Sequence, residues 1–296
     1  MRPWAAAGTA VAVTGAASGI GRALCQRLAA AGASRIFAID QNVRGANETC
    51  DLIAAASSSS ASLKSIKAVH CDVSDERALR AALREAADLQ PLDLFAANAG
   101  IATIGDCSTP VRAWQRAWDI NVMQIVTAAD ELTPTMHKRG GGAFLVTASA
   151  AGLLTQLGSA PYAVTKHAAV ALAEWLAITH GQGGEQGGSG SAAGGGGHER
   201  HGITVSCVCP QGVRTPMIEG LLDGPSRALA LDGLLEAEEV ADEALACLAE
   251  GRFLCMPGGE AKGPQKHVAR KAQDRERWVE GMQRLQAKLL LAPKQE

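Results

Sequence analysis

Short runs of β-branched and aromatic residues alternate along this chain with longer segments whose apolar residues recur at helical spacing. We expect strands at residues 9–14, 35–39, 65–70, 92–96, 143–148, 204–209 and 252–255. We expect helices at residues 19–31, 43–56, 75–88, 113–138, 160–180 and 236–249. A helix between successive strands is the connection that parallel strands need. The alternation therefore predicts an α/β fold with a doubly wound, parallel, seven-stranded sheet.

One segment departs from this alternation of strands and helices. Residues 181–202 hold 11 of the 33 glycines, and such a composition cannot bury enough apolar surface to order itself. A parallel α/β sheet often runs to about 250 residues as one unit, so the 296 residues need not form two domains. We therefore predict a single domain over residues 1–258 that carries a flexible glycine-rich insertion at 181–202.

A basic tail is expected to follow this domain over residues 259–296. Between residues 262 and 296 the chain has nine Lys or Arg and four Asp or Glu. Apolar residues at helical spacing form one stripe there, at Trp278, Met282, Leu285 and Leu289. We predict an amphipathic helical extension that packs against the domain or a partner subunit; docking to a membrane surface or an acidic partner is the alternative.

Composition and charge exclude several classes of protein. With 47% apolar and 20% charged residues the chain is globular, and a net charge of −2 does not give the basic surface of a nucleic-acid binder. No apolar run of about 18 residues is present, so no transmembrane helix is expected. The eight cysteines are too sparse for a disulfide scaffold, and the C-x-C pair of Cys207 and Cys209 lacks further metal ligands. We expect reduced thiols, no metal and a cytoplasmic location.

A glycine motif follows the first expected strand and opens the first expected helix, in Thr14-Gly-Ala-Ala-Ser-Gly-Ile-Gly21. Gly15 permits a tight turn, Gly19 lets the backbone approach a pyrophosphate, and Gly21 allows close packing of helix on strand. The helix N-terminus then offers free N–H groups and a partial positive charge to phosphates. In this context the motif predicts a dinucleotide site and a sheet of the Rossmann type.

Asp40 closes the second expected strand, 19 residues after Gly21. A carboxylate there can accept hydrogen bonds from the ribose hydroxyls of adenosine and repel a 2′-phosphate, so NAD is favoured over NADP. Arg22 and Arg44 count against this preference, because either could reach a phosphate. Asp40 could also serve only as a helix cap or turn residue.

Tyr162 and Lys166 place a phenol and an ammonium four residues apart, on one face of a helix. A cation near a phenol favours the phenolate, so we expect the pKa of Tyr162 to lie below its ordinary value. Such a tyrosine can exchange a proton with a substrate hydroxyl or carbonyl. Tyr162 is the only tyrosine in the chain, and its position beside Lys166 favours a chemical role over that of a core residue.

With these motifs the chain resembles the short-chain dehydrogenase/reductase family over about residues 9–216. The motifs of that family recur in order: the loop Thr14 to Gly21, Cys71-Asp72-Val73, Asn98-Ala99-Gly100, Asn121, Ser149, and the pair Tyr162 and Lys166. The resemblance implies that the cofactor contacts Gly15, Ser18, Gly19, Ile20, Gly21, Asp40, Asp72, Val73, Asn98, Ala99, Gly100, Tyr162, Lys166, Val213 and Thr215.

The same resemblance implies the roles of the catalytic group. Tyr162 would be the general base in oxidation and the general acid in reduction, and Ser149 would hydrogen-bond the substrate oxygen. Lys166 would tune Tyr162 and hold the nicotinamide ribose, while Asn121 would position a water that connects Lys166 to solvent. A turn residue at Ser149 and a helix side chain bonded to backbone at Asn121 are the alternative interpretations.

The sequence departs from the family after the sixth expected strand. Pro210 is followed by Gln211 and only then by Gly212, where the family usually has Pro-Gly. Because Gln211 would resist a positive φ, we expect Gly212 to adopt that conformation instead. Thr215 should still reach the nicotinamide carboxamide.

The expected function is an NAD-dependent oxidoreductase acting on a secondary alcohol or ketone. The alternatives are an NADPH-dependent carbonyl reductase and a dinucleotide-binding regulator without turnover. An apolar loop at residues 217–235 suits an alicyclic or aliphatic substrate, although it could simply pack onto the domain. The family's habit implies a homodimer or homotetramer through the fourth and fifth helices. Trp114, Trp118 and Trp175 are candidates for contacts there; the alternative is that they belong to the core of the domain.

Overall fold

The computed structural model of the chain describes residues 4–56, 63–155, 158–181, 202–219, 234–258, 273–277, 279–281 and 283–284. Most of the predicted glycine-rich insertion and of the apolar loop at 217–235 lies outside these residues. So does the predicted apolar stripe of the tail, from Trp278 to Leu289.

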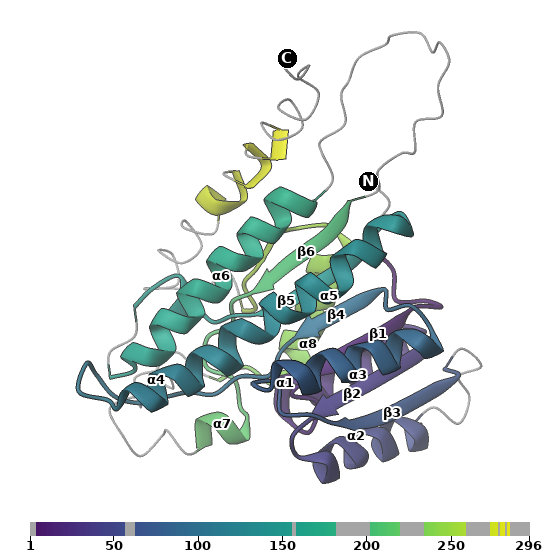
Figure 1. The fold of residues 1–296 in the computed structure, drawn as a ribbon, viewed down its shortest axis with the longest axis horizontal. Coiled ribbons are helices and arrows are strands. Elements are labelled where there is room, and N and C mark those ends of the chain that lie inside the picture. The colour runs from purple at the N-terminus through teal and green to yellow at the C-terminus, as the bar shows by residue number, and fades with distance from the viewer. Residues whose placement is uncertain are drawn as a thin grey trace, which may run out of the picture.

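Seven parallel strands form one sheet in the order β3-β2-β1-β4-β5-β6-β7, which confirms the predicted doubly wound fold (Figure 1). The strands are β1 Ala10–Thr14, β2 Arg35–Asp40, β3 Ser65–His70, β4 Leu94–Ala97, β5 Gly142–Thr147, β6 Ile203–Val208 and β7 Leu254–Cys255. Every residue of β1 and β4 is buried, as expected of strands that are covered on both faces. The order reverses between β1 and β4, so a crevice is expected at the carboxyl ends of these two strands.

Helices cover both faces of the sheet (Figure 1). The helices are α1 Gly19–Ala30, α2 Val43–Ala56, α3 Glu76–Leu89, α4 Val111–Trp118, α5 Gln124–Lys138, α6 Ala160–His180, α7 Pro216–Glu219 and α8 Ala237–Ala249. One apolar core joins α1, α2 and α8 to the sheet, and a second joins α3, α5 and α6 to its other face. Two short segments, η1 Asp119–Met123 and η2 Ala150–Gly152, have π and 3₁₀ geometry.

The helix predicted over residues 113–138 is observed over residues 111–138. It contains a π turn, η1, between α4 and α5, which was not predicted. A π turn bonds residue i to i+5 and widens the helix, which changes the direction in which its side chains point. Periodicity does not reveal such a turn, because the residues on either side keep their helical spacing.

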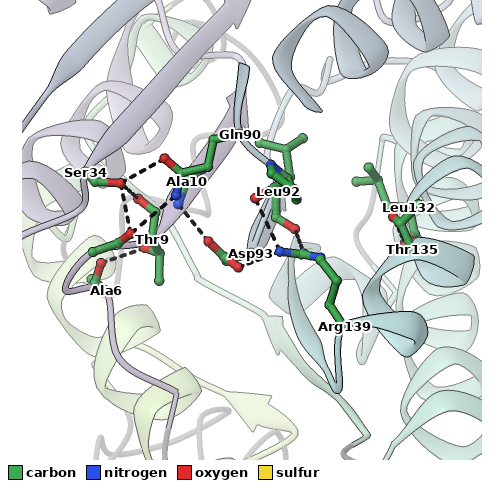
Figure 2. Close-up of polar contacts among 12 residues, drawn as sticks. Ala6, Thr9, Ala10, Ser34, Gln90, Leu92, Asp93, Leu132, Thr135 and Arg139 are labelled. Atoms are coloured by element: carbon green, nitrogen blue, oxygen red, sulfur yellow. Dashed lines mark hydrogen bonds and ion pairs between the residues drawn. The ribbon is translucent and has the colours of Figure 1, made fainter. Parts of the chain in front are cut away.

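The amino-terminal edge of the sheet is closed by polar contacts between strand starts (Figure 2). Asp93, just before β4, accepts a hydrogen bond from the Ala10 amide at 2.9 Å and pairs with Arg139 at 3.0 Å. Arg139 also donates to the Leu92 carbonyl, and the Ser34 hydroxyl donates to backbone carbonyls before β1. These contacts fix the starts of β1 and β4, and therefore the register in which their carboxyl ends reach the opposite edge.

The described part of the tail lies beside α6 and the edge strand β7 (Figure 1). The Glu276 carboxylate accepts hydrogen bonds from the amides of Phe253 and Leu254, at 2.8 and 2.9 Å. Arg275 pairs with Glu174 of α6 at 2.6 Å, and Val279 is 2% exposed within the core of that face. The predicted packing of the tail against the domain is thus observed for these residues. The strand expected over residues 252–255 is observed only as β7, Leu254–Cys255.

Among the residues placed by the structure, no helix is long and apolar enough to cross a bilayer. Trp118 and Trp175 are exposed on α4 and α6, whereas Trp114 is half-buried. The predicted assembly through these tryptophans stays a prediction.

Replacing Val279 by alanine should destabilise the whole domain, because the side chain belongs to its core. Two methyl groups removed from a buried site lower the free energy of unfolding by about 1–3 kcal/mol. Urea unfolding followed by circular dichroism measures this change. Glu280→Ala, at the exposed neighbouring position, is the control and should change it by less than ~0.5 kcal/mol. Equal, small effects of both substitutions would show that the tail is not part of the cooperative unit.

Candidate active site

A cavity of about 520 Å³ opens at the carboxyl ends of the strands, across the point where the strand order reverses. Most of the residues predicted to form the site line it: Gly15, Ser18, Gly19, Ile20, Asp40, Asp72, Val73, Asn98, Ala99, Gly100, Ser149, Tyr162, Lys166, Val213 and Thr215. Gly21 and Asn121 are the two predicted residues that do not. Residues that no sequence motif indicated also line the cavity, among them Gln41, Asn42, Ile101, Leu154 and Ser159, and so do Met217 and Ile218 of the predicted apolar loop.

The glycine loop between β1 and α1 has the backbone that its sequence predicted. Gly15 and Gly19 have φ of +69° and +51°, a region that other residues rarely adopt. A Cβ on Gly21 would lie 2.0 Å from the Gly15 carbonyl oxygen, so this glycine permits α1 to start directly against the turn. A Cβ on Gly19 would meet the Thr215 methyl group at 2.8 Å, which places the segment before α7 against the loop.

Asp40 lies at the end of β2 and is held by two backbone amides. Its carboxylate accepts hydrogen bonds from Ala17 at 3.0 Å and from Asn42 at 2.8 Å. Each oxygen retains further acceptor capacity, and the residue lines the cavity. The turn-residue interpretation and the ligand-binding one are therefore compatible at this position.

Neither arginine that counted against the NAD preference lines the cavity. Arg22 is turned toward α2, where it donates to the Thr49 hydroxyl at 3.0 Å and pairs with Glu48 at 3.4 Å. Arg44 points into solvent, with its side chain 91% exposed and 3.6 Å from Glu48. Within the described lining, Lys166 is the only cationic side chain.

Asp72 follows β3 and is fixed by donors on both oxygens. Ser74 donates its amide and hydroxyl to one oxygen, at 3.0 and 2.8 Å, and Arg116 of α4 donates to the other at 3.0 Å. Burial raises the pKa of the Asp72 carboxyl, but these hydrogen bonds outweigh it and leave the pKa below its ordinary value. Asp72 therefore lines the cavity as an ionised carboxylate.

Ser149, Tyr162 and Lys166 meet at the other end of the cavity. Ser149 follows β5 and accepts a hydrogen bond from the Ala151 amide at 3.1 Å. Tyr162 and Lys166 lie one turn apart on α6, with the ammonium nitrogen 5.7 Å from the centre of the phenol ring. Lys166 is 3% exposed and donates to the Thr147 carbonyl at 2.9 Å. The predicted spacing has therefore brought a hydroxyl, a phenol and an ammonium to one place.

The electrostatics of this group differ from the expectation. Burial raises the pKa of the Tyr162 phenol above its ordinary value, and a hydrogen bond with Ser149 opposes this rise without reversing it. Burial also lowers the pKa of Lys166 from its ordinary 10.5 to about 8. Attraction between the cation and the phenolate favours a lower pKa of Tyr162, but desolvation of both groups acts against either charge, and its effect on the phenol is the larger.

Asn121 lies behind the cavity wall in the π turn η1 and is 2% exposed. Its amide donates to the Ile101 carbonyl at 3.1 Å and to the Thr165 hydroxyl at 2.9 Å, and it accepts from the Ile101 amide at 2.9 Å. Both amide protons are used, which leaves only acceptor capacity on the oxygen. The predicted water relay through Asn121 stays a prediction.

The segment after β6 takes a different path from the one expected. Neither Gln211 nor Gly212 has a positive φ, so the expectation for Gly212 was wrong. The Gly212 carbonyl accepts a hydrogen bond from the Leu235 amide at 2.9 Å, and the Arg214 amide donates to Leu235 in return at 2.8 Å. This pairing with a distant segment holds the turn without a left-handed residue.

Comparison with known proteins agrees with this geometry. The sequence profile of the short chain dehydrogenase family matches residues 9–184. A 1-deoxy-11-beta-hydroxypentalenate dehydrogenase of Streptomyces arenae is 31% identical over 257 residues, 85% of this chain and 83% of that protein. A meso-2,3-butanediol dehydrogenase of Serratia marcescens is 30% identical over 237 residues, 78% and 83% of the two chains.

The fold has similar solved structures as well. A 7 alpha-hydroxysteroid dehydrogenase complexed with NADH and 7-oxo glycochenodeoxycholic acid superposes with a TM-score of 0.73 and 24% identity. The match covers 88% of this chain and 96% of that one. At this level of identity the likeness shows a shared fold.

Replacing Lys166 by methionine should change stability in a pH-dependent way. Because the pKa of Lys166 is about 8 when folded and 10.5 ordinarily, the unfolded chain binds more protons between these values. The free energy of unfolding of the unaltered protein should therefore rise relative to that of Lys166→Met as the pH rises through this range. Urea unfolding at several pH values measures the difference. Lys138→Met, on the exposed end of α5, controls for loss of a lysine charge; a constant difference for Lys166→Met would contradict the argument.

Proposed function

As this chain belongs to the short-chain dehydrogenase/reductase family, and is thus an oxidoreductase of hydroxyl and carbonyl substrates, we propose that it oxidises a secondary alcohol with NAD. The observation that carries the proposal is a single cavity with Asp40 at one end and Ser149, Tyr162 and Lys166 at the other. The cavity volume of about 520 Å³ is within the range of cofactor and ligand sites.

The residues at the glycine loop fit a dinucleotide. Gly15 and Gly19 have positive φ in the turn, and α1 starts at Gly19, so its first amides have no partner within the helix and can donate to a phosphate. The first turn of α1 carries no acidic side chain that would repel a phosphate. Ser18, Gly19 and Ile20 would hold the pyrophosphate, while Thr215 and Val213 would hold the nicotinamide end.

Charge at the adenosine end supports NAD over NADP. Asp40 and Asp72 are the acidic residues of the described lining, and the nearby arginines are engaged by Glu48. A 2′-phosphate beside Asp40 would meet a negative charge with no cation in the described lining near it to offset the repulsion. This arrangement of charges therefore disfavours the alternative function, an NADPH-dependent carbonyl reductase.

Proton transfer is assigned to Tyr162. In oxidation its phenolate oxygen takes the proton of the substrate hydroxyl, and in reduction the phenol returns it. Ser149 hydrogen-bonds the same substrate oxygen, and Lys166 favours the phenolate by its charge. A pKa of about 8 keeps Lys166 mostly protonated at neutral pH, so the charge is present where it is needed. A bound nicotinamide supplies the hydride acceptor or donor.

The chemical end of the cavity suits an uncharged, apolar substrate. Ile101, Leu154, Met217 and Ile218 line the cavity. The charged side chains of its described lining are Asp40 and Asp72, at the adenosine end, and Lys166, beside Tyr162. Lys166, buried beside Tyr162, is the only cation of the described lining, so a carboxylate or phosphate on a substrate would meet no other positive side chain there. An alicyclic or aliphatic secondary alcohol fits these surroundings, and oxidation is the direction in which the two related dehydrogenases are named.

Replacing Tyr162 by phenylalanine should lower kcat by about 100-fold or more, because general acid–base catalysis is removed. The dissociation constant for NADH, measured by nicotinamide fluorescence, should change little. Thr135→Val, which removes a hydroxyl at the far end of α5, is the control and should leave kcat unchanged. Equal turnover of secondary alcohols by the Tyr162→Phe variant and the unaltered protein would refute the assignment.

Replacing Asp40 by asparagine should reduce the preference for NAD over NADP by about tenfold, or ~1.4 kcal/mol, because a repulsive charge is lost. Titrations of both reduced cofactors by fluorescence give the two dissociation constants. Asp51→Asn, an exposed aspartate on α2, is the matched control. Tighter binding of NADPH than of NADH by the unaltered protein would overturn the cofactor proposal.

A further inference from the structure

Gln124 is a polar side chain buried in the interior of the domain. It is the first residue of α5, directly after the π turn η1, and it is 1% exposed. Burying an amide costs free energy unless its donors and acceptor are all bonded. A buried glutamine is therefore expected to join groups that would otherwise lack partners.

The Gln124 amide joins three separate parts of the chain. Its nitrogen donates to the Ala99 carbonyl, in the loop after β4, and to the Ile120 carbonyl, in the π turn, each at 2.6 Å. Its oxygen accepts from the Thr14 hydroxyl, at the end of β1, at 2.8 Å. Both amide protons and the oxygen are thus used within the interior.

Thr14 extends this connection to the loop that lines the cavity. Its hydroxyl oxygen accepts hydrogen bonds from the amides of Asn98 and Ala99, each at 3.0 Å. With its proton directed to Gln124, the closer of two acceptors, the hydroxyl uses its full bonding capacity. The loop is therefore bound to Gln124 both directly, at Ala99, and through Thr14.

The far end of the same loop is bound to the π turn by Asn121, which bonds both backbone groups of Ile101. Gly100 lies between these attachments. A Cβ on Gly100 would be 3.2 Å from the Asn121 oxygen and 3.3 Å from the Lys166 nitrogen, so this backbone passes close to both. A shift of residues 98–101 would move the nucleotide-facing wall relative to Lys166.

We propose that Gln124 is a positioning residue, whose amide holds the end of β1, the loop 98–101 and the π turn of Asn121 as one rigid unit against Lys166. The inference rests on the proposed function, since it assigns Gln124 to the site of nucleotide binding and proton transfer. Gln124 touches neither the cavity nor the reacting groups, and it acts through the Ala99 backbone and Thr14.

The test compares Gln124→Met with Gln115→Met. Methionine keeps the shape of glutamine and removes its hydrogen bonds. Gln115 is exposed on α4, where its side chain donates to Asp119 at 2.7 Å. In Gln124→Met we expect the dissociation constant for NADH, measured by fluorescence, to rise about tenfold. Amide hydrogen exchange of a peptide covering residues 96–102 should become faster. Gln115→Met should change neither quantity.

A double-mutant cycle separates positioning from stability. kcat/KM is measured for the unaltered protein, Gln124→Met, Asn121→Ala and the double variant, at a temperature where circular dichroism shows each to be folded. If both residues hold one unit, the double variant loses clearly less than the product of the two single losses. Multiplicative losses, or a Gln124→Met protein that is less stable yet binds NADH as tightly as the unaltered one, would overturn the inference.

Should Gln124→Met fail to fold, Gln124→Glu is the milder variant, because its protonated form keeps the shape and one donor. As the pH rises, the introduced carboxyl group loses its proton and a carboxylate faces the Ala99 and Ile120 carbonyls, so the Gln124→Glu variant should bind NADH more weakly. Binding that is independent of pH and equal to that of the unaltered protein would count against the proposal.

NADH binding and hydrogen exchange need no substrate. An unaltered protein that binds NADH but oxidises no alcohol would therefore refute the proposed reaction while these measurements still decide the role of Gln124.

Discussion

The burial of a parallel sheet on both faces is the constraint on which the rest of this molecule depends. With helices on either side, β1 and β4 offer no exposed face, so polar groups needed for chemistry cannot lie within them. They appear instead where the strands end: Asp40 is the last residue of β2, Asp72 follows β3 and Ser149 follows β5. The reversal of strand order between β1 and β4 separates the neighbouring loops, and the cavity forms there.

A buried ammonium at this edge has two opposite consequences. Desolvation makes the charge of Lys166 costly, which is why its pKa falls, and the Thr147 carbonyl compensates only part of that cost. The same low-dielectric surroundings strengthen the effect of the charge on any group brought beside it. Tyr162 is subject to the same desolvation, which raises the pKa of its phenol. A site of this kind depends on the exact placement of its charges, because water does little to screen them.

That placement is provided by polar residues outside the cavity. Thr14, Asn121 and Gln124 are each no more than 2% exposed, and each bonds the backbone of the loop after β4. The π turn is part of this arrangement, since it carries Asn121 and offers the Ile120 carbonyl to Gln124. At the opposite edge, Asp93 and Arg139 fix the starts of the same strands, so the sheet is held by polar contacts at both ends.

Local patterns in the sequence determined the strands and helices to within a few residues, the conformations of Gly15 and Gly19, and the meeting of Tyr162 with Lys166 on one helix face. These features depend on residues close together in the chain, where periodicity and sterics act directly. Only the tertiary structure decided the π turn, the short β7, the path at Gly212, the engagement of Arg22 with Glu48 and the direction of the Tyr162 pKa. Each of these depends on burial or on a hydrogen-bond partner supplied by another segment. A hydrogen bond to a distant residue, or the loss of water around a charge, exists only once the chain has packed.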